Sequence, residues 1–317
     1  MIAAIATSVL LPYSTNANTG NLYEIIVALD LLRRMGLTNA DLDSLAELQA
    51  AIVARNTKKA AEITAAFSTV RTKPVGSGLL FDGKTIVEIK NVTQDDSAGC
   101  TGDLLLIDST GATHSLSITG GKAKGRAAAL TIEKCLSNPT AERFGCTAED
   151  ITDFKAIGLA TVPKYKDEMA AKYGAEETAW SRKPSAAAVE ACADVAARTV
   201  TRYASFDAEK QLAIFKDLLR IVGDGKPADY LGLVHPEKHT VSFYEFSACL
   251  VSAWAPRLEA HGIYIHFFAD ASHKIGTTQV KFNNGVWHKG KTSSIHSSWN
   301  ATFNLTDLFR MRAVSLG

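Results

Sequence analysis

The hydrophobic pattern changes its period near residue 79, and this change limits the folds that are open to the chain. Residues 21–36 repeat apolar side chains at the spacing of an amphipathic helix. Further on, residues 78–92, 102–109 and 113–119 are short runs rich in β-forming side chains and separated by turn residues. The change predicts an α/β (α+β) chain with a mixed central sheet flanked by helices.

Helix caps and turn residues indicate where the other elements begin and end. Residues 38–70 predict one or two further helices, with Thr38 or Asn39 as the N-cap and Asn56 as a break. Gly111 suits a tight turn between the second and third β-rich runs. The remaining predicted helices are 147–159, capped by Thr147, then 164–173, 185–203, 207–222 and 244–262, interrupted near Pro256; the remaining predicted strands are 261–270 and 277–284.

Charge and cysteine content disfavour several classes of protein. Lys and Arg (34) nearly balance Asp and Glu (33), so any site for a polyanion must be a local patch. The five cysteines are an odd number without a CxxC pair, which disfavours a disulfide framework and a thiolate zinc site. The N-terminal segment lacks the basic region of a signal peptide, and no apolar run is long enough to span a bilayer. We expect a cytoplasmic protein with reduced thiols and no membrane contact.

Acidic and basic side chains gather around the three β-rich runs. Asp103 opens the second run, Glu88 and Lys90 share one face of the first, and Ser117 lies on the third. Metal-dependent cleavage of a phosphodiester needs two or three oxygen ligands on neighbouring strands and a lysine near the attacking water. These residues supply pieces of that pattern. The competing interpretation of Asp103 is an ordinary carboxylate in a turn at the edge of a strand.

The pattern resembles the core of the PD-(D/E)xK nucleases, and of type II restriction endonucleases in particular. The resemblance covers about residues 20–145 and depends on "NLYEIIVAL", "TGDLLLID" and "HSLSIT" in succession. It implies that Asp103 is the family aspartate and principal ligand of Mg²⁺, that Ser117 occupies the variable position, and that Glu24 on the early helix is a supporting ligand. Glu88 is a further candidate ligand.

Thr119 stands where the resemblance requires the catalytic lysine. Three explanations stay open. Lys122, three residues further on, supplies the ammonium; Lys90 supplies it from the adjacent strand; or the chain binds DNA without cutting it.

Two segments are candidates for contact with DNA. "GGKAKGR" carries Lys122, Lys124 and Arg126 directly after the third β-rich run, where they could contact phosphates, although a solvated loop also explains them. A later segment combines basic, amide and aromatic side chains suited to base edges and phosphates; the alternative is an exposed β-hairpin whose aromatic residue caps the core. Its candidate residues are Lys281, Asn283, Asn284, Trp287, Lys289 and Lys291.

We expect a sequence-specific, Mg²⁺-dependent endonuclease for double-stranded DNA. Residues 1–150 would form the nuclease-like core, and residues 151–317 a helical and mixed part that completes the sheet and contacts DNA. Restriction enzymes often act as dimers on palindromes, so the resemblance implies a homodimer. One alternative is a catalytically inactive nuclease-fold protein that binds DNA or has a structural role in a nucleoprotein or viral assembly. The other alternative is an enzyme of another class, although the chain lacks a serine or cysteine nucleophile signature.

Overall fold

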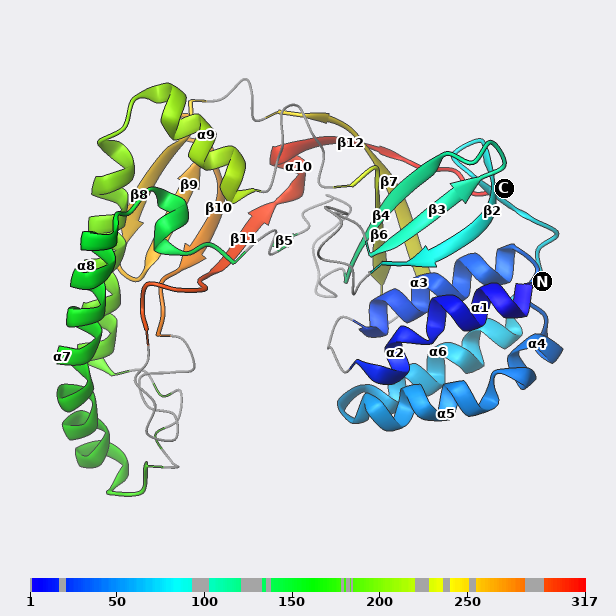
Figure 1. The fold of residues 1–317 in the computed structure, drawn as a ribbon, viewed down its shortest axis with the longest axis horizontal. Helices are drawn as coiled ribbons and strands as arrows, with labels where there is room; N and C mark the ends of the chain where they lie inside the picture. The colour runs from blue at the N-terminus through cyan, green and yellow to red at the C-terminus, as the bar shows by residue number, and fades with distance from the viewer. Residues whose placement is uncertain are drawn as a thin grey trace. The chain divides into compact units, whose positions relative to one another are not determined.

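The chain forms two compact units, each with its own sheet (Figure 1). Unit 1 comprises Met1–Ala129, Lys226–Ala248 and Phe309–Gly317, and unit 2 comprises Leu130–Gly225 and Cys249–Leu308. The mixed α/β architecture expected from the change of period is confirmed. The computed structural model describes residues 2–16, 21–92, 103–120, 133–134, 138–177, 180, 183, 185–219, 228–235, 240–250, 255–282 and 294–317.

Unit 1 begins with a layer of helices, as predicted for residues 21–70. Thr38 forms the predicted cap, because its hydroxyl accepts the backbone N–H of Asp41 while the Asp41 carboxylate accepts the backbone N–H of Thr38. Asn56 breaks the second predicted segment, and its amide donates to the carbonyls of Ile52 and Tyr13. The helices are α1 (Ile2–Leu10), α2 (Pro12–Thr15), α3 (Asn21–Arg34), α4 (Asn39–Ser44), α5 (Ala46–Arg55), a short 3₁₀ turn (Thr57–Lys59) and α6 (Ala60–Thr72).

Helix α3 lies at the centre of the core of unit 1. Its side chains are buried on nearly every side, since it packs against α1 and α6 as well as against the sheet. Helix α1 was not predicted, although Ala6, Val9 and Leu10 are fully buried at helical spacing and join the same apolar cluster. Figure 1 shows that α1 to α6 gather on one side of the sheet.

The sheet of unit 1 has seven strands in the order β1-β2-β3-β4-β6-β7-β12. The three predicted runs form four strands, because the first run divides into β1 and β2 at Asp82 and Gly83, and these strands pair antiparallel in chain order, with Gly111 (φ 87°) in the turn between β3 and β4. β6 then pairs parallel to β4 and antiparallel to β7. The strands are β1 (Leu79–Phe81), β2 (Lys84–Asn91), β3 (Leu104–Asp108), β4 (Thr113–Gly120), β6 (Tyr230–His235), β7 (Thr240–Cys249) and β12 (Phe309–Ala313).

The two edges of this sheet meet, so that it curls round on itself. Phe81 of β1 forms an antiparallel bridge with Leu316, which follows β12, and Arg312 of β12 contacts both carboxylate oxygens of Asp82 at 2.8 Å. Both contacts come from the same guanidinium nitrogen, and hydrogen bonds between charged groups are among the stronger ones in proteins. The hydroxyl of Tyr230 donates to Asp82 at 3.1 Å, which ties β6 to the same turn. These contacts close the sheet through residues far apart in the sequence.

Unit 2 packs helices on one side of a five-stranded sheet ordered β5-β11-β10-β9-β8, with antiparallel pairs throughout. Its core is aromatic; the ring of Phe267 lies 6.1 Å from Phe144 and 6.0 Å from Phe215, centroid to centroid. The elements are β5 (Glu133–Lys134), a 3₁₀ turn (Ala141–Phe144), α7 (Ala148–Tyr173), α8 (Ala186–Ala204), α9 (Ala208–Leu218), β8 (Arg257–His261), β9 (Tyr264–Phe268), β10 (Lys274–Gln279), β11 (Asn300–Asn304) and α10 (Leu305–Leu308).

Three features differ from the sequence predictions. The helix predicted for 244–262 is wrong for its described part, because residues 244–249 lie in β7 and residues 257–261 in β8, where ladder pairing overrides the helical propensity of the Ala, Leu and Glu residues. The two helices predicted between 147 and 173 are one helix, α7, which begins at the predicted cap Thr147 and continues through Pro163. The chain also divides differently from 1–150 and 151–317, because unit 1 takes three late strands into its sheet.

Candidate functional site

The start of β3 brings Asp103 and Ser117 together. The Asp103 carboxylate accepts the backbone N–H of Ile118 at 2.5 Å, so it lies beside the Ser117–Ile118 peptide of β4. The backbone of Asp103 is held from both neighbouring strands: its N–H donates to Leu116, and its carbonyl accepts from Val92. A carboxylate accepts up to about four hydrogen bonds, so this bond leaves capacity for further contacts.

Ser117 and Glu24 belong to opposite sides of the sheet. Leu116 and Ile118 point into the apolar cluster that contains α3, and side chains alternate along a strand, so Ser117 points the other way. Its side chain is nevertheless buried, with 4% exposed. Glu24 lies in the first turn of α3 with 6% exposed, on the helical side.

A contact between Tyr23 and Gly120 fixes the end of β4 that lies nearest to Glu24. A Cβ atom on Gly120 would lie 2.5 Å from Cζ of Tyr23, so the ring rests directly on the glycine backbone. Glu24 follows Tyr23 in α3, and α3 packs against β4 and β6. The structure therefore brings the predicted helical carboxylate to the same strand as Ser117, from the other face.

The two predicted residues of β2 lie further from Asp103. The backbone N–H of Val92 donates to Asp103, so Val92 marks the level of Asp103 on the neighbouring strand. At about 3.3 Å per residue, Lys90 lies about 7 Å and Glu88 about 13 Å from Val92 along that strand. Their side chains form an ion pair of 3.7 Å and are half-exposed. Because Glu88 draws the Lys90 amine away from Asp103, the structure does not bring these two residues into one site with Asp103.

The fit to a metal ion is partial. Among the residues that the structure describes, no group of three or more His, Cys, Asp or Glu side chains is arranged to hold a metal ion. Mg²⁺ usually keeps several waters and takes one or two carboxylates together with substrate phosphates. Asp103 with the Ser117 hydroxyl matches that smaller donor set.

Most of the predicted DNA-contacting residues lie outside the described residues. Within the described part, Lys281 follows β10, and its amine donates to the side-chain carbonyl of Asn300 at 3.0 Å. The predicted residues outside the described part are Lys122, Lys124, Arg126, Asn283, Asn284, Trp287, Lys289 and Lys291.

A basic cleft in unit 1 was not predicted. It has a volume of about 590 Å³ and is lined by Arg33, Arg34, Lys73, the loop of residues 74–78 and the start of β7. Arg33 is 4% exposed and donates to the carbonyls of Leu37, Arg71 and Lys73, which joins the C-terminal ends of α3 and α6. The adjacent "RR" and "KPVGSG" stretches were the available signal.

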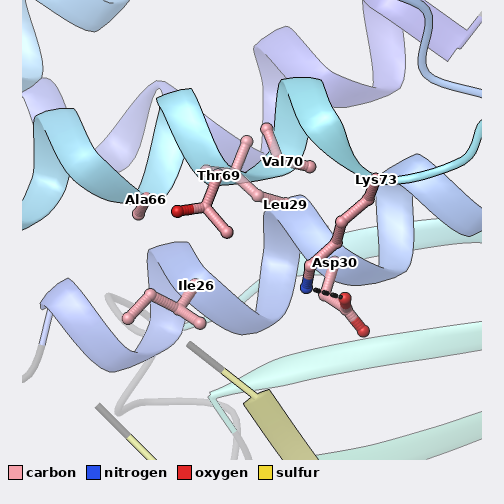
Figure 2. Close-up of a pocket in the computed structure, with 7 residues that line it drawn as sticks. All are labelled: Ile26, Leu29, Asp30, Ala66, Thr69, Val70 and Lys73. Carbon is pink, nitrogen blue, oxygen red and sulfur yellow. Dashed lines mark hydrogen bonds and ion pairs between the residues drawn. The ribbon is translucent and has the colours of Figure 1, made fainter. Parts of the chain in front are cut away.

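Figure 2 shows a small cavity next to this cleft, between α3 and α6. Apolar side chains line most of it, and an ion pair of 2.5 Å between Asp30 and Lys73 closes one end. Arg34 also contacts Asp30, at 3.2 Å. The cavity volume of about 10 Å³ is near the minimum for one water. Because the Asp30 carboxylate and the Arg33 guanidinium are both engaged within the protein, this region serves packing.

Comparisons with models of protein families, with curated proteins and with solved structures find no match. In the described part of the chain, no helix combines the length and apolar character that a membrane span requires.

Proposed function

We propose that the chain is a sequence-specific endonuclease for double-stranded DNA that works with Mg²⁺ as a homodimer. The observation that carries the proposal is the contact between the Asp103 carboxylate and the Ser117–Ile118 peptide. It joins two of the motifs on which the resemblance to PD-(D/E)xK nucleases depends, across the hairpin that β3 and β4 form. A mixed sheet packed against helices, which is the fold class that the resemblance implies, also supports the proposal.

In this proposal Asp103 and the Ser117 hydroxyl hold the ion, and Glu24 is left out of the ligand set because it lies on the opposite side of the sheet, on α3. Bound Mg²⁺ would polarise the scissile phosphate and lower the pKa of a coordinated water. We leave Glu88 out of the ligand set because it lies about 13 Å along β2 from the level of Asp103. Lys90 can contribute its ammonium only after it leaves Glu88, and Lys122 stays the other candidate.

A second candidate function is binding of DNA without cleavage. Thr119 is the specific observation that favours it, since this residue occupies the position of the catalytic lysine and pairs in the ladder with Leu233. A threonine hydroxyl cannot supply the positive charge that steadies the transition state. Both functions would use the same surface of the protein to bind DNA, and they differ in whether the bound DNA is cleaved.

The test is a cleavage assay beside a binding assay. Purified protein is incubated with mixed-sequence duplex DNA in Mg²⁺, in Mn²⁺ and in EDTA, and compared with Asp103→Asn and with Asp153→Asn, an exposed carboxylate on α7. Discrete fragments that need metal and vanish only in Asp103→Asn support the endonuclease. Binding without fragments supports the second function, and absence of both binding and cleavage contradicts both.

A further inference from the structure

One face of the sheet of unit 2 carries a row of ring side chains on the side away from the helices. Along β9, Ile265 and Phe267 are fully buried, whereas the alternate residues point to the other face, where Tyr264 is 41% exposed. Phe267 contacts aromatic rings of the helical layer, and α8 packs against β8 and β9 (Figure 1). We call the opposite side the open face and define it by His261, Tyr264, His266, Phe268, Lys274 and Lys281.

The rings of the open face form a continuous row across two strands. Register pairs place His261 opposite Tyr264, and the rings of His261 and His266 are 5.3 Å apart. His266 is followed by Phe268 at 6.4 Å, and the guanidinium of Arg257 lies 4.7 Å from the centre of the Phe268 ring. Burial, with the charges of Lys274 and His261, lowers the pKa of His266, which favours the neutral form of its ring.

Cations flank this row. Lys274 pairs with Phe268 in the β9–β10 ladder and is exposed, and Lys281 binds a neutral amide oxygen, which leaves its charge uncompensated by that contact. Glu259, the acidic residue of β8, forms its ion pair with Arg257. The open face therefore combines stacking surfaces with net positive charge.

We infer that the open face binds single-stranded DNA. Aromatic platforms stack on the faces of bases with little regard to sequence, and neighbouring cations follow the phosphates. In a duplex these faces are covered by neighbouring base pairs, so the row favours an unpaired strand. From Tyr264 to Phe268 the row extends about 13 Å along β9, enough for several bases. The inference goes beyond the proposed endonuclease and does not depend on Asp103.

The test measures binding of a fluorescently labelled oligo-dT by anisotropy, in EDTA so that cleavage cannot contribute. Tyr264→Ala should weaken binding roughly 5- to 100-fold, because one base–aromatic stack is lost. Lys274→Ala should reduce the dependence of binding on salt concentration. The matched control is Tyr173→Ala on α7, another exposed tyrosine, whose ring lies 4.8 Å from Lys183 and 5.4 Å from Lys172.

Loss of oligo-dT binding in Tyr264→Ala with normal binding in Tyr173→Ala supports the inference. Equal effects of the two substitutions, tighter binding of a duplex than of oligo-dT, or no binding of oligo-dT would each overturn it. Circular dichroism on each variant separates loss of binding from loss of fold. An Asp103→Asn protein that still binds oligo-dT distinguishes failure of this surface from failure of the proposed nuclease site.

Discussion

Substitutions of Asp103 can distinguish two roles of its carboxylate, which are the hydrogen bond that holds β3 against β4 and the metal binding that we propose. The carboxylate accepts the backbone N–H of Ile118 and fastens the start of β3 to β4. Asp103→Ala removes the acceptor and leaves that N–H without its partner. Hydrogen bonds to charged groups contribute about 1.5–3 kcal/mol; because Asp103 is half-buried, we expect a loss of stability in the lower part of this range, about 1.5–2 kcal/mol.

Asp103→Asn is the informative companion variant. Its amide oxygen can still accept the Ile118 N–H, so we expect a loss below about 1 kcal/mol. Its neutral amide oxygen binds Mg²⁺ far more weakly than a carboxylate does, so cleavage should be lost in both variants. Urea unfolding followed by circular dichroism measures stability, and cleavage of duplex DNA in Mg²⁺ measures activity. The exposed Asp153→Ala should change stability by less than about 0.5 kcal/mol.

Two results would refute this reasoning. If Ala and Asn at residue 103 unfold at the same urea concentration as the parent chain, the carboxylate does not hold the strands together. If Asp103→Asn still cuts DNA at the parent rate, Asp103 does not bind the metal. A variant that loses cleavage but keeps stability and DNA binding has the pattern expected of a metal ligand.

Four further predictions follow. Thr119→Lys should introduce or raise metal-dependent cleavage, because the ammonium would enter at the position of the family lysine; unchanged activity in a folded variant argues against a simple loss of that residue. Gly120→Ala should lower the free energy of unfolding by about 1–3 kcal/mol, since the new Cβ would lie 2.5 Å from the Tyr23 ring. Thermal unfolding measures this loss against Gly111→Ala, where the added Cβ meets no atom within 4 Å but the turn has a left-handed backbone. Arg33→Ala should lower the free energy of unfolding in urea by about 2–4 kcal/mol, because three backbone carbonyls lose their hydrogen bonds from the buried guanidinium. Arg33→Lys should restore only part of this stability, because an ammonium group lacks the several N–H donors of a guanidinium. Hydrogen bonds from Thr110 and His114 lower the pKa of Asp108, so the ionised carboxylate stabilises the fold above about pH 4 and this stabilisation is lost as pH falls through the lowered pKa. Asp108→Asn should therefore reduce the dependence of stability on pH below about pH 4. An acid unfolding transition that is the same in Asp108→Asn and in the parent chain would contradict this prediction.

Features decided by local interactions could be predicted from the sequence. The capping boxes at Thr38 and Thr147 depend on residues three apart, and the turn at Gly111 requires a positive φ that glycine adopts easily. The alternating strands of residues 79–120 and the helix at 21–34 follow from hydrophobic period alone. Each of these signals is contained within a few residues.

Features decided by long-range pairing could not be predicted in the same way. The segment around Phe246 has helix-forming neighbours, yet it becomes β7 because β6 offers it a ladder. Closure of the sheet depends on Arg312 reaching Asp82 across 230 residues of sequence. The aromatic row of unit 2 did have a signal, since Tyr264, His266 and Phe268 alternate, but its exposure depends on which face the helices cover.

The same distinction governs the candidate site. The sequence indicated Asp103 and Ser117 separately, and the hairpin between them made their meeting predictable, because β3 and β4 are joined by a short turn. Glu88 was chosen because it shares a motif with Lys90, but the ladder places it about 13 Å from the level of Asp103. The spacing of a carboxylate two residues before a lysine is therefore weaker evidence for a metal site than the position of that carboxylate relative to the aspartate on the neighbouring strand. For this chain the register leaves Asp103 and Ser117 as the pair on which the proposed chemistry depends, and since Asp103 also fastens the two strands, only a substitution that keeps the Ile118 contact can test that chemistry alone.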